Sequence, residues 1–294
     1  PDGREGWAQY FLRRGYAVYV VDTAGRGRAA GNYDGWGELS SPRLPWTEER
    51  FVAPERHMSW PQASLHTQWP GTGRAGDPHF DQFYASQVSS IAEFPRQQAL
   101  NAEAGAALID RIGAAVLVVH SQAGTFGWLI ADRRPGKIKA IVAVEPNGPP
   151  AHDIDFQGAP TWFKDNEVTK AGGLCHLPLT YDPPLQEGEQ LAFVCETEAQ
   201  GPGLVRCWRQ AEPARKLKNI AGVPVLILQG EASYHAPYDH CTAQYLEQAG
   251  VANTFVRLAD RGIRGNGHMM MIENNSDEIA AVIEGWLRER LGAA

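Results

Sequence analysis

The sequence predicts an α/β fold in which a mostly parallel central sheet carries helices on both faces. Three observations predict it. Apolar runs of strand length recur along the 294 residues and are nearly continuous, which is typical of strands buried on both faces. Segments with helical periodicity separate these runs. Polar or glycine-rich residues follow the runs, as at the carboxyl edge of a parallel sheet, where active sites lie.

The first part of the chain contains one predicted helix, one predicted strand and a long insertion. Residues 7–14 have the pattern of a short helix, and residues 16–21 (YAVYVV) have that of a strand. Residues 31–90 have no clear period and are rich in Trp, Pro, Gly and His. Because structureless stretches of this length are usually functional or disordered, 31–90 is expected either to wall a pocket or to pack on its own aromatic side chains.

The middle of the chain alternates helices with strands. Residues 94–112 place apolar side chains at helical spacing, and residues 114–119 (AAVLVV) are the next predicted strand. A helix is expected over 125–132, and residues 138–144 (IKAIVAV) predict a third strand. The irregular stretch at about 146–222 then lies where such folds insert a cap.

The last part of the chain continues the alternation. Strands are predicted over 224–228 (PVLIL) and 254–258, with a helix over 238–248 between them. The closing helix, 277–291, has apolar residues at a 3.6-residue period: Ile279, Val282, Ile283, Trp286 and Leu287. The whole chain, 1–294, is therefore interpreted as one domain with an aromatic-rich insertion at about 31–90 and a cap-like insertion at about 146–222.

Composition excludes several classes of function. The net charge of −7 and the absence of a basic run argue against nucleic acid, because phosphate binding needs clustered Lys and Arg. No apolar stretch reaches the roughly 18 residues of a membrane span. No signal peptide is visible, and the chain starts at Pro1 rather than Met, so a processed or incomplete chain is expected.

The cysteine spacing predicts no metal site. The four cysteines have no C-x-x-C spacing, so zinc is not expected, and nothing in the sequence calls for an organic cofactor. Two disulfides and free buried thiols both remain open, and a 195–207 pairing is one guess because it would close a short hairpin. The cysteines are Cys175, Cys195, Cys207 and Cys241.

A serine after the second predicted strand has the context of a nucleophile. Residues 120–124 (HSQAG) lie between a strand and a helix, which is the setting of the G-x-S-x-G nucleophile elbow, with His120 in place of the first glycine. Such a turn exposes the Ser121 hydroxyl and directs backbone N–H groups, here that of Gln122, at a developing oxyanion. Gly124 keeps a side chain from crowding the turn.

An acid and a histidine follow at later strand ends. Glu145 closes the strand after the elbow, and His268 follows the last strand in a glycine-rich loop. The order Ser, acid, His is the one that α/β-hydrolases use. Glu231, at the end of the following strand, is the alternative acid. The other histidines are expected to be surface or hydrogen-bonded residues: His57, His66, His79, His152, His176, His235 and His240.

The chain resembles the α/β-hydrolases and, more narrowly, the 713-type bacterial esterases. The resemblance rests on four blocks, residues 1–30 (PDGREGWAQYFLRRGYAVYVVDTAGRGRAA), 118–124 (VVHSQAG), 141–148 (IVAVEPNG) and 265–275 (GNGHMMMIENN). It implies Ser121 as nucleophile, His268 as base and Glu145 as the acid. Most α/β-hydrolases carry the acid one strand later, at the position of Glu231.

The same resemblance predicts structure outside the numbering of this chain. Members of the family carry a strand and a Gly-rich loop upstream of the segment that matches Pro1. That strand would lie between 16–21 and 114–119, and its loop would supply the second oxyanion donor. Two strands cannot pair across a gap of about 9–10 Å, twice the strand spacing. We therefore expect an upstream segment, or a separate chain, to complete the sheet; a homodimer is also open.

The leading hypothesis is a serine hydrolase that cleaves a carboxylic ester or lactone of a hydrophobic or aromatic substrate. A C–C bond or amide hydrolase with the same triad, and a non-catalytic binding protein, are the alternatives. A secreted or periplasmic location follows from the resemblance, with a cytoplasmic one still open. Substrate contacts are expected from the side chains of His120, Trp36, Trp60 and Trp69.

Overall fold

The computed structural model describes residues 2–31 and 34–292. The chain divides into two compact units. The sheet unit comprises Phe94–Gln229 and His235–Val256, and the histidine unit comprises Pro1–Glu93, Gly230–Tyr234 and Arg257–Ala294. The interpretation of 1–294 as a single domain stays a prediction, and so do the bounds of its two insertions. Positions 32 and 33 of the insertion expected at 31–90 lie outside the described residues.

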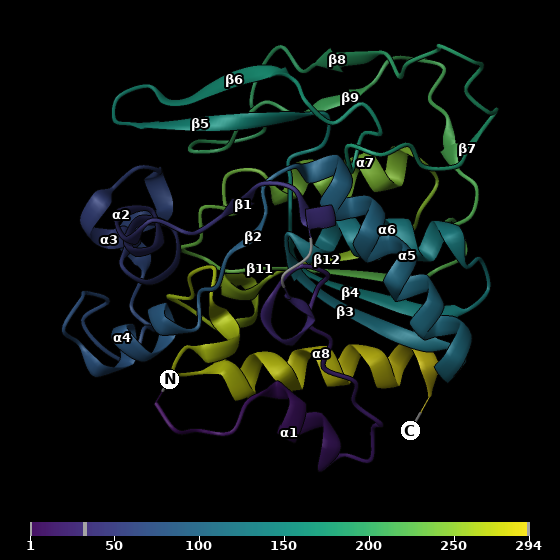
Figure 1. Cartoon of the computed structure of the whole chain (residues 1–294). Coiled ribbons are helices and arrows are strands. Elements are labelled where there is room, and N and C mark those ends of the chain that lie inside the picture. Colours follow the sequence, from purple (N-terminus) through teal and green to yellow (C-terminus); the bar gives the residue numbers. More distant parts are fainter. Residues whose placement is uncertain (1, 32–33, 293–294) are drawn as a thin grey trace. The chain divides into compact units, whose positions relative to one another are not determined.

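Four strands form the central sheet in the order β12–β11–β4–β3 (Figure 1). They span Ala115–Ser121 (β3), Ile138–Pro146 (β4), Val225–Gln229 (β11) and Asn253–Arg257 (β12). Both β3 and β11 run parallel to β4. All of β11 and nearly all of β4 is buried, which explains why these two strands are continuously apolar in sequence. The parallel sheet predicted from the sequence is thus confirmed.

Three helices pack in the sheet unit. They are α5 (Phe94–Ile112), α6 (Ala123–Arg133) and α7 (Asp239–Gln248), as the apolar periodicity predicts to within about two residues at each end. Helix α6 packs against β3, β4 and α5, and α7 packs against β11. One buried apolar cluster joins the three helices to the strands, with Ile109, Trp128, Ile141 and Tyr245 among its members.

Strand β3 is an outer strand of the described sheet. It pairs with β4 in register from Ala115 to Ser121, and Val118 on it is 49% exposed. Outer strands present a row of backbone groups that a further strand can pair with. The additional strand that the sequence predicts beside β3 stays a prediction.

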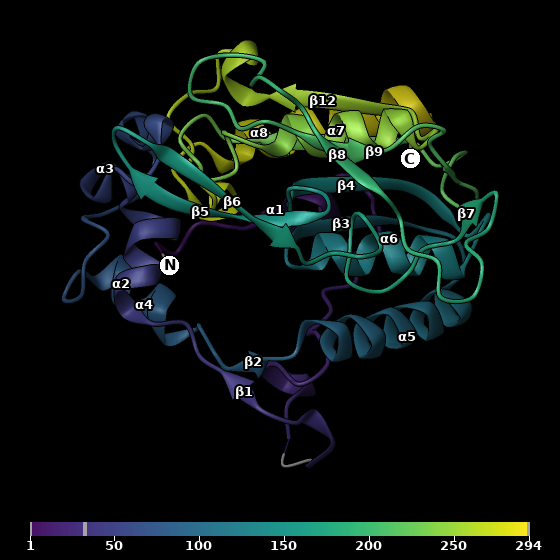
Figure 2. The same cartoon turned by 90° about the horizontal axis from the view of Figure 1, so that it is seen from above.

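The segment expected as a cap contains short antiparallel pairs (Figure 2). The long pair joins β5 (His152–Gly158) to β6 (Trp162–Val168). The shorter pairs join β7 (Tyr181–Asp182) to β10 (Lys216–Leu217), and β8 (Phe193–Cys195) to β9 (Trp208–Gln210). This stretch therefore has more regular structure than its lack of sequence periodicity indicates.

The guessed 195–207 disulfide is wrong. Cys207 is bonded to Cys241, with 5.2 Å between their Cα atoms, and Cys175 and Cys195 are free. The reason is strand alternation. Cys195 is opposite Trp208 in the β8–β9 pair, so the side chain of the neighbouring Cys207 points to the other face of the pair. There it meets Cys241 on α7, and the bond ties the hairpin to that helix.

In the histidine unit, α1 (Trp7–Leu12) packs on the closing helix α8 (Ser276–Leu291). The indole of Trp7 donates to the Ser276 carbonyl at 2.9 Å, and the Tyr10 hydroxyl bonds Glu284 at 3.2 Å. Four members of the predicted apolar stripe of α8, Ile279, Ile283, Trp286 and Leu287, are buried, and the fifth, Val282, is partly buried. Among the described residues, no helix combines the length and the apolar character that a membrane span requires.

The strand predicted over 16–21 is wrong within the described residues. Helix α1 ends at Leu12, the turn after it closes at Gly15, whose φ of +87° favours glycine, and 16–21 continues without a strand assignment. Tyr19, Val20 and Val21 are 59–67% exposed. An apolar run becomes a strand only where a neighbouring strand accepts its backbone hydrogen bonds, and none of the described strands pairs with 16–21.

The stretch at 31–90 consists mainly of short helices joined by turns. The β1–β2 pair joins Leu39–Ser40 to Ser90–Ile91. The longest helix, α4 (Pro78–Ala85), begins at Asp77, whose carboxylate accepts from the N–H groups of His79 and Phe80. The other described helices of this stretch are η2 (Asp34–Trp36), α2 (Leu44–Thr47), η3 (Glu48–Val52), α3 (Pro54–His57) and η4 (Pro61–Leu65), and η1 (Gly27–Ala29) precedes it. Two further turns flank the last loop, η5 (Leu258–Arg261) and η6 (Met270–Ile272).

Candidate active site

Ser121 lies at the sharp turn between β3 and α6 in the sheet unit. Its φ is +52°, in the left-handed region that non-glycine residues rarely adopt, and its carbonyl accepts from Asn147 N–H at 2.8 Å. The next residue, Gln122, is the N-cap of α6. The Ser121 side chain is thus at the positive end of a helix dipole. This local geometry is the one that a nucleophile elbow requires, and the role of Ser121 as nucleophile stays a prediction.

Gly124 allows the elbow to lie against the end of β4. A Cβ atom on Gly124 would lie 2.5 Å from Pro146 Cβ and 2.8 Å from Pro146 Cα. Real Cβ atoms do not approach so closely, so any larger residue would push α6 away from β4. The prediction that Gly124 keeps a side chain from crowding the turn is confirmed.

We expect Gly124→Ala to lower stability by about 1–3 kcal/mol, the usual cost of overpacking a tight contact. Gly285→Ala is the matched control, because Gly285 also lies in a helix and a Cβ there would meet nothing within 4 Å. Chemical denaturation would measure both. A Gly124→Ala protein as stable as the Gly285→Ala control would contradict the packing argument.

Glu145 lies at the carboxyl end of β4, beside Ser121 at the end of β3. In the parallel register of the two strands, Ser121 aligns with Pro146, the residue after Glu145. Glu145 is fully buried and has a φ of +43°. Ser121 and Glu145 are two of the five described non-glycine residues that have a positive φ. Strained backbone of this kind costs about 1–3 kcal/mol per residue and concentrates at functional sites.

A buried histidine that the sequence did not single out lies beside Glu145. His235 places a ring nitrogen within 4.8 Å of a Glu145 carboxylate oxygen. Its Nδ1 pairs with Asp239 Oδ1 at 2.8 Å, and both side chains are buried. Burial raises the pKa of Asp239 well above its ordinary value. Glu145 thus lies in a buried, hydrogen-bonded environment of ionisable groups within the sheet unit.

His268 lies in the histidine unit, in the loop after β12. Its ring is fully buried and stacks on Phe51, with 5.4 Å between ring centroids and 22° between planes. The Tyr234 hydroxyl lies 3.3 Å from His268 Nε2, a long hydrogen bond. Two aromatic side chains therefore hold the imidazole by its face and by one nitrogen.

Glu231, the alternative acid, serves the loop that precedes His268. Its carboxylate accepts from Arg264 Nη1 at 2.6 Å and from Gly265 N–H at 2.9 Å. Both oxygens are therefore engaged in holding residues 264 and 265. The choice between Glu145 and Glu231 as the acid stays a prediction.

The predicted substrate contacts divide into packed and less buried side chains. Trp60 is fully buried and donates to the Ala232 carbonyl at 3.0 Å, and Trp69 lies in a buried cluster with Phe80 and Phe83. These two match the alternative in which 31–90 packs on its own aromatics. His120 and Trp36 are partly exposed. Contact of any of the four with substrate stays a prediction.

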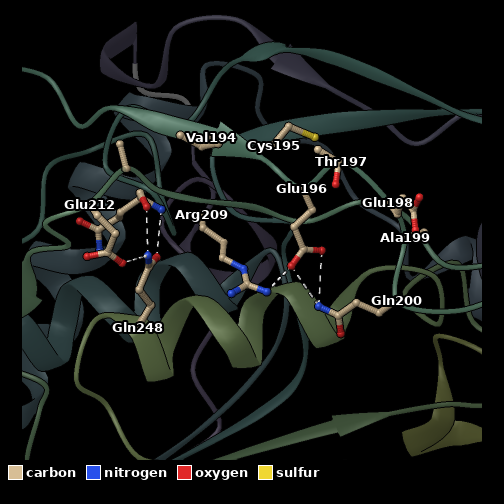
Figure 3. A pocket seen from close by; sticks show the side chains of 12 residues that line it. Val194, Cys195, Glu196, Thr197, Glu198, Ala199, Gln200, Arg209, Glu212 and Gln248 are labelled. Atoms are coloured by element: carbon tan, nitrogen blue, oxygen red, sulfur yellow. Dashed lines mark hydrogen bonds and ion pairs between the residues drawn. The ribbon is translucent and has the colours of Figure 1, made fainter.

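A pocket of about 700 Å³ lies elsewhere in the sheet unit (Figure 3). It is lined by β8, β9 and the end of α7, and an ion pair between Arg209 and Glu196 crosses it.

Three side chains of the sheet unit, Cys207, Cys241 and His240, have the spacing of metal ligands. Both cysteine sulfurs are committed to the disulfide, so they do not act as thiolate ligands.

Several residues around the predicted triad were missed in the sequence. Tyr234 and Phe51 come from segments without periodicity, so no pattern indicates that they meet His268. The pair His235 and Asp239 has a usable signal, because residues four apart face each other on a helical turn. Glu273 was part of the block GNGHMMMIENN, but nothing in its spacing indicates a buried carboxylate.

Comparison with known proteins identifies relatives. The protein named "Probable secreted lipase phiG", from Fungal sp. (strain ATCC 74256), is 43% identical over 292 residues, which cover 99% of this chain and 77% of that protein. The chain belongs to the family of this fungal protein. No protein-family model matches the sequence.

A solved structure shows the same fold. The structure described as "The Atomic Resolution Structure of a Novel Bacterial Esterase" superimposes with a TM-score of 0.57 at 21% identity, over 98% of this chain and 75% of that one. At this identity the match concerns the fold alone, which is that of α/β-hydrolases. The fold class predicted from the sequence is therefore confirmed.

Proposed function

We propose that the chain is a serine hydrolase that cleaves a carboxylic ester or lactone of a hydrophobic or aromatic substrate through an acyl-enzyme. One observation carries the proposal: Ser121 and Glu145 both have positive φ at adjacent strand ends, in a relative of a protein named a lipase. The name of the structural neighbour, an esterase, agrees with it. The proposal includes the narrower likeness to the 713-type bacterial esterases.

In the proposed mechanism, the Ser121 hydroxyl attacks the substrate carbonyl while His268 accepts its proton. The tetrahedral oxyanion is stabilised by the N–H of Gln122 and by a second donor outside this numbering. His268 then passes the proton to the leaving alcohol, and the acyl-enzyme is hydrolysed by water in the reverse sequence. Glu145 holds the imidazole in one tautomer and stabilises its charged form.

A covalent probe tests the proposal directly. A fluorophosphonate should label the protein at Ser121, and mass spectrometry of the digested protein would locate the adduct. Folded protein that remains unlabelled would favour the alternative of a non-catalytic binding protein. A panel of p-nitrophenyl esters, lactones and anilides would then separate ester hydrolysis from amide hydrolysis, and a diketone substrate would test C–C cleavage.

The pH profile is a second expected result. His268 must be neutral to accept a proton, so kcat/KM should fall as the pH is lowered and the imidazole becomes protonated. The profile would be measured under subsaturating ester between pH 5 and 8. Activity that stays constant down to pH 5 would contradict a histidine base.

Secretion is part of the proposal, with support from two sources. The relative's name includes the word "secreted". The Cys207–Cys241 disulfide is the kind of bond that persists in oxidising compartments and is rare in the cytosol.

A further inference from the structure

A buried carboxylate, Glu273, organises the loop that carries His268. Its Oε1 accepts from Gly267 N–H at 2.9 Å, and its Oε2 accepts from the Asn266 side-chain amide at 2.7 Å. Glu273 and Asn266 are both fully buried. The carboxylate thus fixes the two residues that immediately precede His268.

A second histidine neutralises this carboxylate. His66 Nε2 lies 2.9 Å from Glu273 Oε1, and His66 Nδ1 lies 3.0 Å from Glu55 Oε2. A ring with a carboxylate at each nitrogen must donate from both, which only the imidazolium form can do. Burial by itself lowers the pKa of His66, but the hydrogen bonds and charges of Glu273 and Glu55 outweigh it and raise the pKa to about 9.

The loop backbone passes directly beside the hydrogen-bonded pair of His66 and Glu273. A Cβ atom on Gly267 would lie 2.9 Å from His66 Nε2 and 3.0 Å from Glu273 Oε1. Thr67 N–H also donates to the Gly265 carbonyl at 3.0 Å. The chain leading into His268 is therefore packed against the His66–Glu273 pair at Gly267 and hydrogen-bonded to Thr67 at Gly265.

The backbone that follows His268, at Glu273 and Asn274, is held by Arg4. The Arg4 guanidinium donates to the carbonyl groups of Asn274 at 2.6 Å and Glu273 at 3.0 Å. Arg56 lies 3.6 Å from the Glu55 carboxylate. The charged groups that these contacts place around His66 are thus Glu55 and Glu273, with Arg56 and Arg4 beyond them.

We propose that His66, as an imidazolium between Glu55 and Glu273, is a positioning residue for His268. The proposal rests on the proposed function, since its consequence is the placement of the general base. Misplacing a catalytic group by about 1 Å can reduce a rate about 100-fold. The role of His66 is to keep the 265–267 backbone, and with it the His268 ring, in one position.

Two substitutions separate the two contacts of the ring. Glutamine can place its amide nitrogen near the site of Nε2, so His66→Gln keeps a donor for Glu273. Asparagine reaches only the site of Nδ1, so His66→Asn leaves Glu273 without it. We expect His66→Asn to lower kcat by up to about 100-fold with little change in KM, and His66→Gln to lower it much less. The control is His57→Asn, an exposed histidine of α3.

The pH dependence gives a readout that a merely structural role would not move. The folded pKa of His66 is raised above its unfolded value of about 6.5. The positioning is therefore complete below about pH 6.5 and is lost as the pH rises through about 9. The wild-type kcat should fall above about pH 9, and this alkaline fall should be absent in His66→Gln.

Hydrogen exchange tests the positioning without any activity. The amides of Gly267 and His268 should be protected in the wild type and His66→Gln, and should exchange faster in folded His66→Asn. Unchanged protection in His66→Asn, or lost protection with an unchanged kcat, would overturn the proposal. If the wild type proves to have no esterase activity, the proposed function fails, and the exchange rates alone decide whether His66 holds the loop.

Discussion

Replacing Ser121 with alanine should lower kcat for ester hydrolysis by about 10⁴-fold or more while leaving the fold intact. Loss of the nucleophile removes the covalent pathway, and only binding and oxyanion stabilisation remain to assist water. Ser121 is a partly exposed residue at the end of β3, and its positive φ is a property of the backbone, so alanine should keep the turn. Hydrolysis of p-nitrophenyl esters of several chain lengths would measure the loss.

The control for this change is Ser89→Ala, which removes an exposed hydroxyl that bonds Ser41 at 2.6 Å. Both variants should melt within a few degrees of the wild type. Ser121→Ala must be prepared without wild-type contamination, because a trace of active enzyme would mask the effect. Substantial residual hydrolysis in a pure preparation would show that Ser121 is not the nucleophile.

The central strands could be predicted from the sequence because their burial is nearly uniform. The runs at 138–144 and 224–228 are apolar at successive positions since both faces of β4 and β11 are covered. The run at 16–21 is equally apolar, yet Val20 and Val21 are exposed. The hydrophobic pattern of a segment indicates which side chains it could bury. Strand formation also needs a neighbouring strand at the correct distance, and the order of strands in the whole sheet decides whether there is one.

The candidate site was predictable to the extent that it depends on local sequence. Ser121 and Glu145 follow their strands directly, so counting strand ends is sufficient to find them. Their surroundings depend on segments far apart in the sequence, as when His66 meets Glu273 across 207 positions. Local patterns carry no information about such contacts. The Cys207–Cys241 bond was missed for the same reason, since its partner lies on a helix 34 residues away.

Glu145 and Glu231 differ in what their carboxylates do in the structure. Glu231 bonds Arg264 and the Gly265 N–H, contacts that hold a loop and that a glutamine oxygen can partly replace. Glu145 is fully buried at the end of β4, within 4.8 Å of His235, where the charge of a carboxylate is costly unless it is paired and hydrogen-bonded. The two residues therefore give a matched pair of substitutions.

We expect Glu145→Gln to lower kcat by about 10⁴-fold, the effect known when the acid of a triad becomes an amide and the histidine adopts the wrong tautomer. Glu231→Gln should lower it by less than about 10-fold, because the loop loses only part of one ion pair at an exposed arginine. Both variants remove one negative charge and keep the side-chain shape, so each controls for the other. Rates with one ester at pH 8 would measure both, together with melting curves to show that each variant is folded. If Glu231→Gln were the crippling change, the acid would lie one strand later, at the position that most α/β-hydrolases use, and the likeness to the 713-type esterases would have to be given up.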